Sequence, residues 1–199
     1  LGWEQAFENG NPIGLTGDGA SVTLEPGGQV EMSGRVWPSL HGSKEELDRH
    51  IASLVRIGGQ LGIRFLATGA VPGSRLEETE WMPKRRYQIM RAIMERTGSL
   101  GHRMMKHTAT VQSNFDYSDE EDARLKFRLS MALVPILVAM SANSPVIDGR
   151  PTGYKSYRAQ VWRNTDPDRC GLLEFAFDTE GIFRAYTEYA LDVPMYFLS

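Results

Sequence analysis

The sequence predicts an α+β fold in which a largely antiparallel sheet is combined with flanking helices. Three observations support this class. The opening of the chain has short apolar groups separated by Asn-Gly, Gly-Asn-Pro and Gly-Asp-Gly, which is typical of strands joined by tight turns. Helical patterns with capping residues follow later in the chain. Strands and helices do not alternate in the regular way that a parallel sheet requires.

The composition is that of an ordinary globular protein. The 199 residues, 41% hydrophobic and 24% charged with a net charge of −3, suffice for one domain or two small ones. This charge gives no indication of the clustered basic surface that a nucleic-acid-binding protein needs, so no nucleic-acid partner is expected. The single cysteine, Cys170, fits a reducing compartment, and we expect a cytoplasmic location. The longest apolar run, 131–140, is too short to span a bilayer, so no membrane partner is expected.

The first predicted helix begins at Ser43. Glu46 lies three residues on, which is the capping-box arrangement, and apolar residues then recur at helical spacing until Gly62 ends the helix. Residues 63–69 are predicted to form the strand that follows. Pro83 is expected to open the next helix.

Further helices are predicted in the second half of the chain. Ser118 and Glu121 form a second capping box, which predicts a long helix through Ala142 with a kink at Pro135. A last helix is predicted from the helical spacing of apolar residues in 182–190.

A strand is predicted over residues 108–116, where apolar and polar residues alternate. Its polar face carries Thr110, Gln112 and Asn114, which are uncharged hydrogen-bonding residues. Such a row suits a wall that orients a polar ligand. An exposed strand face rich in threonine is an equal alternative.

The segment VTLEPGGQVEMSG predicts a β-hairpin with a three-residue loop, Pro-Gly-Gly. This loop pairs Glu25 with Gln29 and Thr23 with Glu31, and it needs Gly28 in the left-handed region of φ/ψ space. One face then holds the apolar residues Val22, Leu24, Val30 and Met32. The other face holds Thr23, Glu25, Gln29, Glu31 and Ser33. The apolar set fixes this register, because a slip of one residue would reverse both faces.

The two carboxylates of this hairpin, Glu25 and Glu31, are therefore expected to be diagonal neighbours, roughly 5–8 Å apart. Like charges so close repel each other unless a cation or solvent screens them. Mg²⁺ is commonly held by one or two carboxylates together with water and phosphate. The pair is thus a candidate Mg²⁺ site, and a solvated sheet face is the alternative.

Several motifs together resemble a known family. LEPGGQVEMSG is similar to the LEPGGQFELSG hairpin of the plant and proteobacterial type of glutamate–cysteine ligase. Later blocks resemble that family in its order and near its spacing: WMPKRRYQIMR, GSLGHRMM, TATVQSNFDYSDEEDARLKFRLSMAL, ANSP, SYRAQVWRNTDPDRCG and YALDVPMYF. The likeness covers essentially the whole chain.

The resemblance implies a glutamine-synthetase-like fold, in which an antiparallel sheet forms an open funnel for substrates. It also implies the first step of glutathione biosynthesis, with L-glutamate, L-cysteine and ATP as small-molecule substrates. ATP phosphorylates the γ-carboxylate of glutamate, and the cysteine amine attacks the acyl phosphate. Mg²⁺ is the expected cofactor, because phosphoryl transfer depends on charge neutralisation.

The family's motifs imply roles for charged residues of this chain. Glu25 and Glu31 match hairpin carboxylates that resemble Mg²⁺ ligands. Arg86 and Arg158 match arginines near the γ-carboxylate and phosphates, where a planar guanidinium can hold two oxygens. Alternatively, both arginines are ordinary surface residues. For Arg86, the neighbouring Lys84 makes a basic start of a helix an equally good interpretation.

Other matched residues imply substrate contacts. Gln112 and Asn114 match a strand that lines the funnel, and Thr110 precedes them on the same face. Met195 and Tyr196 match a segment that looks like part of the cysteine-side pocket. Without the resemblance, both would be interpreted as core residues. Three further residues of a well-matched block have no assigned role: Trp162, Asp166 and Arg169.

The departures from the family pattern keep other functions open. Val30 replaces a usual Phe, Arg85 a usual Gly and His107 a common Arg. A related carboxylate–amine ligase with a different amine, or a non-catalytic domain on the same scaffold, are the alternatives. The missing initiator methionine and the apolar C-terminal end predict that residues 1–199 are the central part of a single catalytic domain, truncated at both ends. We expect the isolated fragment to be inactive and poorly soluble.

Overall fold

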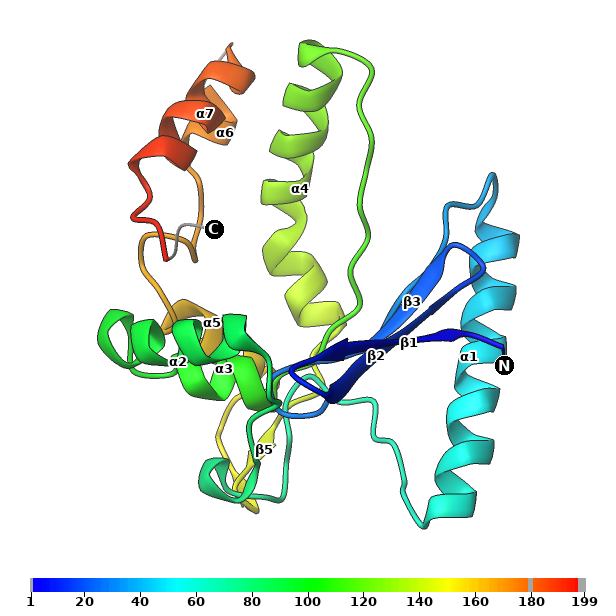
Figure 1. Ribbon diagram of the computed structural model, residues 1–199. Helices are drawn as coiled ribbons and strands as arrows, with labels where there is room; N and C mark the ends of the chain where they lie inside the picture. Colours follow the sequence, from blue (N-terminus) through cyan, green and yellow to red (C-terminus); the bar gives the residue numbers. More distant parts are fainter. Residues whose placement is uncertain (1, 179–180, 197–199) are drawn as a thin grey trace. The chain divides into compact units, whose positions relative to one another are not determined.

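A computed structural model describes residues 2–178 and 181–196 of the chain (Figure 1). The backbone contacts divide the chain into two compact units. Unit 1 comprises Leu1–Ala67 and Thr79–Gln88, and unit 2 comprises Thr68–Glu78 and Ile89–Ser199. Helices and an antiparallel sheet are both present, which confirms the predicted α+β class.

Unit 1 is built on a four-stranded antiparallel sheet in which each strand pairs with the next along the chain. The strands are β1 (Glu4–Glu8), β2 (Asn11–Gly17), β3 (Ala20–Leu24) and β4 (Val30–Ser33). The first two turns have positive φ at both central residues, Asn9-Gly10 and Asp18-Gly19. That is the geometry of the tight hairpin turns whose twist matches the strands. The predicted punctuation of the opening segment is therefore confirmed.

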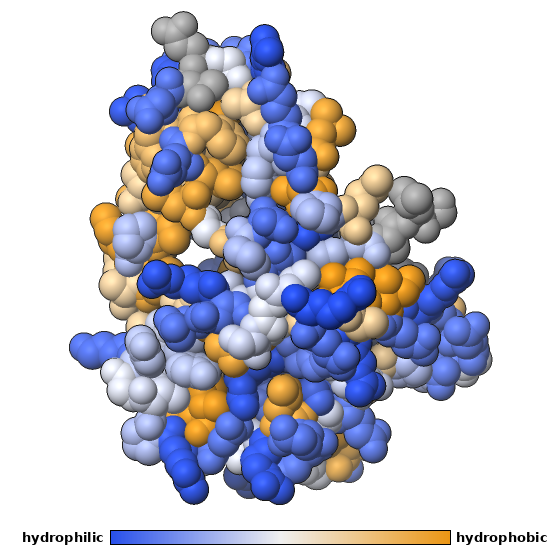
Figure 2. All heavy atoms as spheres, turned by 90° about the vertical axis from the view of Figure 1, so that its left-hand side faces the viewer, coloured by the Kyte–Doolittle hydropathy of each residue, from blue (hydrophilic) through white to orange (hydrophobic). Residues whose placement is uncertain are grey.

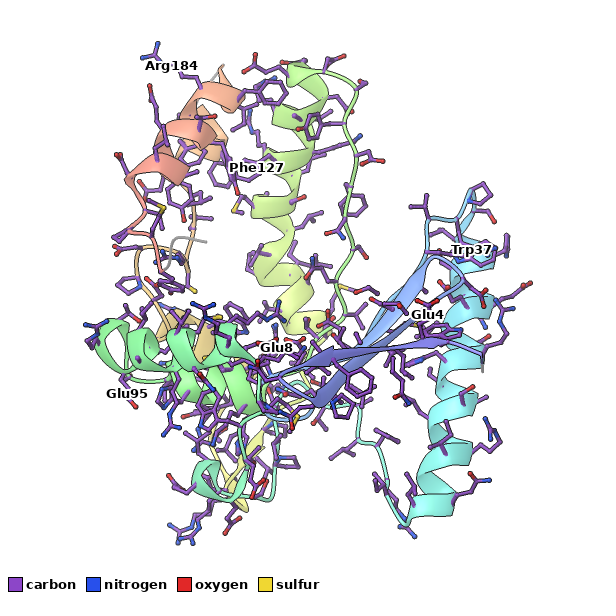
Figure 3. The ribbon with its side chains drawn as sticks, viewed as in Figure 1. Glu4, Glu8, Trp37, Glu95, Phe127 and Arg184 are labelled. Carbon is purple, nitrogen blue, oxygen red and sulfur yellow. The ribbon has the colours of Figure 1, made fainter. Side chains whose placement is uncertain are left out.

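The helix of unit 1, α1 (Leu40–Leu61), begins earlier than predicted. Its N-cap is Ser39, and the predicted N-cap Ser43 lies within the helix. The carboxylate of Glu46 accepts a hydrogen bond from the Trp37 indole at 2.9 Å, so it serves the preceding segment instead of a capping box (Figure 3). The predicted end is confirmed, because Gly62 forms the C-cap with φ of 70°.

Two predicted strands, residues 63–69 and 108–116, are irregular. A single antiparallel bridge joins Ala70 to Thr108, and the amide of Ala109 donates to the carbonyl of Gly69 at 3.3 Å. Alternation of side chains favours a strand only where a neighbouring strand completes its backbone hydrogen bonds. Among the described residues, neither segment has such a neighbour beyond this bridge.

Unit 2 is mainly helical, and the first residues of α2 belong to unit 1. Its longest described helix is α4 (Glu120–Met140). The other helices, in chain order, are η1 (Leu76–Glu78), α2 (Arg85–Thr97), α3 (Gly101–His107), α5 (Tyr157–Arg163), α6 (Phe175–Asp178) and α7 (Ile182–Asp192). A small antiparallel hairpin consists of β5 (Val146–Ile147) and β6 (Arg150–Pro151). The predicted helix over 182–190 is confirmed as α7.

The long helix α4 begins one residue after its N-cap Asp119, so the predicted capping box at Ser118 is displaced by one position. The side chain of Asp119 accepts a hydrogen bond from the amide of Asp122 at 2.9 Å. Because Asp119 can bond the helix start directly, it takes the role expected of the serine. Pro135 lies inside the helix, as predicted.

Apolar side chains of α4 and α7 meet through aromatic rings. Phe127 of α4 lies edge-on to Tyr186 of α7, with ring centroids 5.9 Å apart (Figure 3). Elsewhere both helices leave large apolar side chains exposed, among them Leu137 and Leu191. Figure 2 shows apolar side chains gathered over the region of α6 and α7. Within the described ranges, no helix combines the length and apolarity needed to cross a membrane.

Candidate functional site

The hairpin formed by β3 and β4 has the predicted register. Thr23 pairs with Glu31, and the amide of Glu25 donates to the carbonyl of Gln29 at 2.8 Å. Gly28 has φ of 82°, as the three-residue loop requires. The pairing places Glu25 and Glu31 on the same face of the hairpin.

The carboxylate of Glu25 is joined to the start of α2. Its Oε1 accepts a hydrogen bond from the Tyr87 hydroxyl at 3.2 Å and lies 3.6 Å from Nη2 of Arg86. The same Nη2 donates to the Tyr87 hydroxyl at 2.8 Å. Glu25, Arg86 and Tyr87 therefore form one connected polar cluster, which we call the open cluster. Tyr87 has no role in the predictions from sequence, although it directly follows Arg86 in the matched block.

Backbone contacts bring these residues together. The amide of Met82 donates to the carbonyl of Pro26 in the hairpin loop at 2.9 Å. The amide of Arg85, at the start of α2, donates to the Glu8 carboxylate at the end of β1 at 2.6 Å (Figure 3). Tyr87 is 3% exposed and fixes this first turn of α2 in the core. Arg86 thereby lies beside Glu25.

The electrostatics of the open cluster are governed by burial and by close opposite charges. Burial, and then the positive charge of Arg86, lower the pKa of the neighbouring Lys84. Burial raises the pKa of Tyr87. The hydrogen bond to Tyr87 raises the pKa of Arg86, with smaller contributions from the negative charges of Glu25 and Glu31. Both acids of the hairpin thus act on the same guanidinium.

The carboxylate oxygens of Glu25 and Glu31 fit the coordination of a Mg²⁺ ion whose other ligands are water and phosphate. The contacts of Glu25 use Oε1, so Oε2 makes no hydrogen bond among the described residues. Glu31 is exposed, and its carboxylate has neither a hydrogen bond nor an ion pair within this part of the chain. The described residues contain no group of three or more His, Cys, Asp or Glu side chains suited to a metal. Two carboxylates match the usual protein share of a Mg²⁺ site.

The second predicted arginine, Arg158, lies in the first turn of α5 in unit 2. Its guanidinium carbon is 5.5 Å from the centroid of the Trp162 ring. Its Nε is buried and has no hydrogen-bond partner among the described residues. Burial lowers the pKa of Arg158, and no neighbouring carboxylate opposes that shift. A partly desolvated cation without an acid beside it suits the binding of an anion.

The polar residues predicted to line a strand lie in an exposed irregular segment. The side-chain amide of Gln112 donates from Nε2 to Oδ1 of Asn114 at 3.1 Å, so these two side chains lie together. The Thr110 hydroxyl donates to the neighbouring carbonyl of Val111. No hydrogen bond or ion pair among the described residues joins them to Arg158. Their role as a funnel wall stays a prediction.

The predicted cysteine-side residues have unlike surroundings. The side chain of Met195 is exposed. The Tyr196 hydroxyl donates to the carboxylate of Asp166, and the Arg169 guanidinium lies over the Tyr196 ring at 3.7 Å. Arg169 also donates to Asp166 at 2.8 Å. Asp166, Arg169 and Tyr196 therefore form a second polar cluster, which we call the closed cluster. An Asp followed three residues later by an Arg was the available signal for it.

Comparisons with known proteins identify the family of the chain. Residues 5–198 match the model of a family described as glutamate-cysteine ligase family 2 (GCS2). The chain is 46% identical over 196 residues to the chloroplastic glutamate–cysteine ligase of Nicotiana tabacum and to chloroplastic ligase B of Oryza sativa subsp. japonica. It is also 46% identical over 195 residues to the chloroplastic ligase of Arabidopsis thaliana. Each match covers 98% of this chain but only 37–40% of the relative.

The predicted cytoplasmic location is wrong by this comparison, since these relatives are named as chloroplastic proteins. A single cysteine reports on redox conditions, and it does not distinguish one reducing compartment from another. The family match spans nearly the whole chain, and the quoted motifs lie within it. The chain therefore belongs to glutamate-cysteine ligase family 2.

Proposed function

We propose that this chain is part of a glutamate–cysteine ligase that joins the γ-carboxylate of L-glutamate to the amine of L-cysteine, using ATP and passing through γ-glutamyl phosphate. The observation that carries the proposal is the 46% identity over 98% of the chain to ligases of that name. The relatives also support a plastid location and, with the motifs, a glutamine-synthetase-like catalytic domain. The chain spans about two fifths of their length, so residues outside it complete the activity.

The proposed reaction gathers negative charge from the ATP phosphates and the γ-carboxylate of glutamate. Mg²⁺, when bound, would neutralise phosphate oxygens. Glu25 and Glu31 would hold it through the oxygens that make no hydrogen bond in the described residues. Arg86 would supply donors beside the same carboxylates, because its side chain is 55% exposed and remains accessible to a ligand.

Arg158, in unit 2, would bind an anionic group of a substrate. It carries a charge that no described acid neutralises, and its burial strengthens its attraction for an anion. Gln112, Asn114 and Thr110 would orient polar groups of the substrates. Met195 would contact the cysteine side, while the Tyr196 hydroxyl is already bonded to Asp166.

The test uses the full-length protein that carries this chain. With ATP, Mg²⁺, L-glutamate and L-cysteine we expect equal amounts of ADP and γ-glutamylcysteine, and no ADP when glutamate is left out. A panel of other amines tests the specificity. If cysteine reacts no faster than other amines, the chain belongs to a carboxylate–amine ligase with a different amine substrate. The departure at His107 gives that alternative no support, because His107 is fully buried.

A non-catalytic domain on the same scaffold is distinguished by one substitution. Glu31→Gln keeps the shape of an exposed side chain that makes no hydrogen bond among the described residues. Loss of turnover with an unchanged melting temperature supports the ligase, and unchanged turnover supports a scaffold without catalysis.

A further inference from the structure

We propose that Gly69, Ser144 and Trp162 are positioning residues that hold Arg158 for anion binding, each acting on a different part of the arginine. This inference rests on the proposed function, in which Arg158 binds an anionic substrate group. The three residues come from three separate segments of unit 2. None of them has a role in the predictions from sequence.

Ser144 holds the backbone of Arg158. The N-cap of α5, Ser156, makes no side-chain hydrogen bond to the helix start. Instead the carbonyl of Ser144 accepts from the amide of Tyr157 at 3.1 Å, and its Oγ accepts from the amide of Arg158 at 3.0 Å. Amides in the first turn of a helix have no partner within the helix. A residue fourteen positions away therefore performs the capping of α5, and it is 2% exposed.

Gly69 leaves room for the aliphatic part of Arg158. A Cβ at position 69 would lie 3.4 Å from Cδ of Arg158 and only 2.7 Å from Oδ1 of Asn143. That oxygen accepts a hydrogen bond from the amide of Gly69 at 2.7 Å. The backbone of Gly69 thus packs directly against the Arg158 stem. A larger residue would displace Asn143, Arg158 or both.

Trp162 covers the charged end of Arg158. It lies four residues later on the same helix, which is the spacing that places side chains next to each other. Its ring and the guanidinium carbon are 5.5 Å apart, within cation–π range. The ring restricts the guanidinium without using any of its N–H donors. No ion pair within the described residues uses these donors, and Nε is buried without a hydrogen-bond partner there, so an anion would not have to displace an acid.

A matched control lies nearby. The hydroxyl of Thr165 is buried and donates to the carbonyl of Val161 at 2.9 Å, and no hydrogen bond among the described residues joins it to Arg158. Thr165→Val and Ser144→Ala each remove one buried hydroxyl from the same unit. Any general loss of stability should appear in both variants, whereas an effect through Arg158 should appear only in Ser144→Ala. Trp162→Phe is the conservative partner of Trp162→Leu, because it keeps an aromatic face.

The main experiment is a double-mutant cycle in the full-length protein, with kcat and KM for glutamate and ATP measured separately. Misplacing a binding group by about 1 Å can cost up to ~100-fold in rate. We expect Ser144→Ala and Trp162→Leu to lower kcat/KM ~10- to 100-fold, and Thr165→Val and Trp162→Phe to lower it less than about 3-fold. In an Arg158→Lys background the first two changes should have little further effect, because the group they position is gone.

The arginine side-chain NMR signal tests the positioning without relying on activity. In the wild-type protein, the Nε–H signal that disappears in Arg158→Lys should show the ring-current shift of Trp162. Trp162→Leu and Ser144→Ala should change it, and Thr165→Val should not.

The two proposals fail in different ways. A wild-type protein that forms no ADP, but shows the expected NMR changes, refutes the ligase assignment and keeps the positioning of Arg158. If Ser144→Ala and Trp162→Leu lower kcat/KM as much in the Arg158→Lys background as in the wild-type protein, the positioning of Arg158 is refuted. An Nε–H signal that neither Ser144→Ala nor Trp162→Leu changes also refutes it.

Discussion

The open cluster and the closed cluster contain the same three kinds of side chain but differ in the burial of the acid. In the open cluster, the side chain of Glu25 is 26% exposed and that of Arg86 is 55% exposed. In the closed cluster, Asp166 is 1% exposed. Each carboxylate accepts a hydrogen bond from a tyrosine and lies beside an arginine.

The two clusters differ in how many oxygens of the carboxylate remain without a hydrogen bond. Both oxygens of Asp166 are used, because the amide of Asp168 donates to Oδ1 at 3.0 Å while Arg169 and Tyr196 donate to Oδ2. Burial alone would raise the pKa of Asp166, but these hydrogen bonds outweigh it and hold the pKa below its usual range. Glu25 keeps Oε2 without a hydrogen bond among the described residues. The same chemistry therefore serves structure in one unit and suits a ligand in the other.

The largest expected effect is the loss of stability in Asp166→Asn. The change removes a buried negative charge from three donors, which we expect to cost about 3 kcal/mol of unfolding free energy. Chemical denaturation of the full-length protein measures it. Asp168→Asn is the control, because the Asp168 side chain is exposed and should change stability by less than about 0.5 kcal/mol. Equal losses of unfolding free energy in Asp166→Asn and Asp168→Asn would contradict the structural role of the closed cluster.

The next effect is a loss of activity in Glu25→Gln and Glu31→Gln. Each variant removes a proposed Mg²⁺ ligand, so we expect ~100-fold lower kcat/KM, or about 2.7 kcal/mol, and a higher Mg²⁺ requirement. The unfolding free energy should change by less than about 1 kcal/mol, because these acids are partly or fully exposed. Glu4→Gln, on β1 of the same sheet, is the control. A Mg²⁺ titration that is the same for all three variants would remove both glutamates from the metal site.

An alkaline titration should reveal the closed cluster. Burial, and then the hydrogen bond to Asp166, raise the pKa of Tyr196 to about 12. An unfolded tyrosine titrates near ~10, so the folded state holds its proton longer. The stability from this group is complete below pH ~10 and is lost as the pH rises towards ~12. Tyr196→Phe should remove this alkaline loss, measured by unfolding at a series of pH values. A variant with the wild-type pH profile would show that the phenol is not held in this way.

The smallest effect is expected for Tyr87→Phe. The variant keeps the buried ring and removes only the hydroxyl that joins Glu25 to Arg86. We expect a cost of about 1 kcal/mol in stability and a rate loss below ~10-fold. Tyr157→Phe removes a hydroxyl from another tyrosine and serves as the comparison. A loss larger than that of Glu25→Gln would mean that Tyr87 has a direct role.

Sequence alone predicted the β3–β4 hairpin, because its register depends on neighbouring residues. The Pro-Gly-Gly loop and the alternating apolar residues specify it within a few positions. Residues 108–116 alternate just as clearly, yet they are irregular. Their state depends on a partner strand, and no local pattern reports whether one is present.

The candidate site was predicted unevenly for the same reason. Glu25, Arg86 and Arg158 were proposed from motifs, and their site roles stay predictions, but the contacts that position them come from distant residues. The start of α5 was missed because its capping group is Ser144 and not a residue just before the helix. Asp166 gave little signal, since an Asp in a loop is usually exposed. Burial and long-range hydrogen bonds could be assigned only from the structure.

The contact between the loop of the β3–β4 hairpin and the segment before α2 has a mechanical consequence. The Met82–Pro26 hydrogen bond attaches the hairpin tip to the segment just before α2, and the Tyr87 hydroxyl attaches it to the first turn of α2. The tip therefore cannot swing over a bound molecule as a free flap. Any closing movement must carry the first turn of α2 with it, so the hinge for such a movement must lie outside the tip.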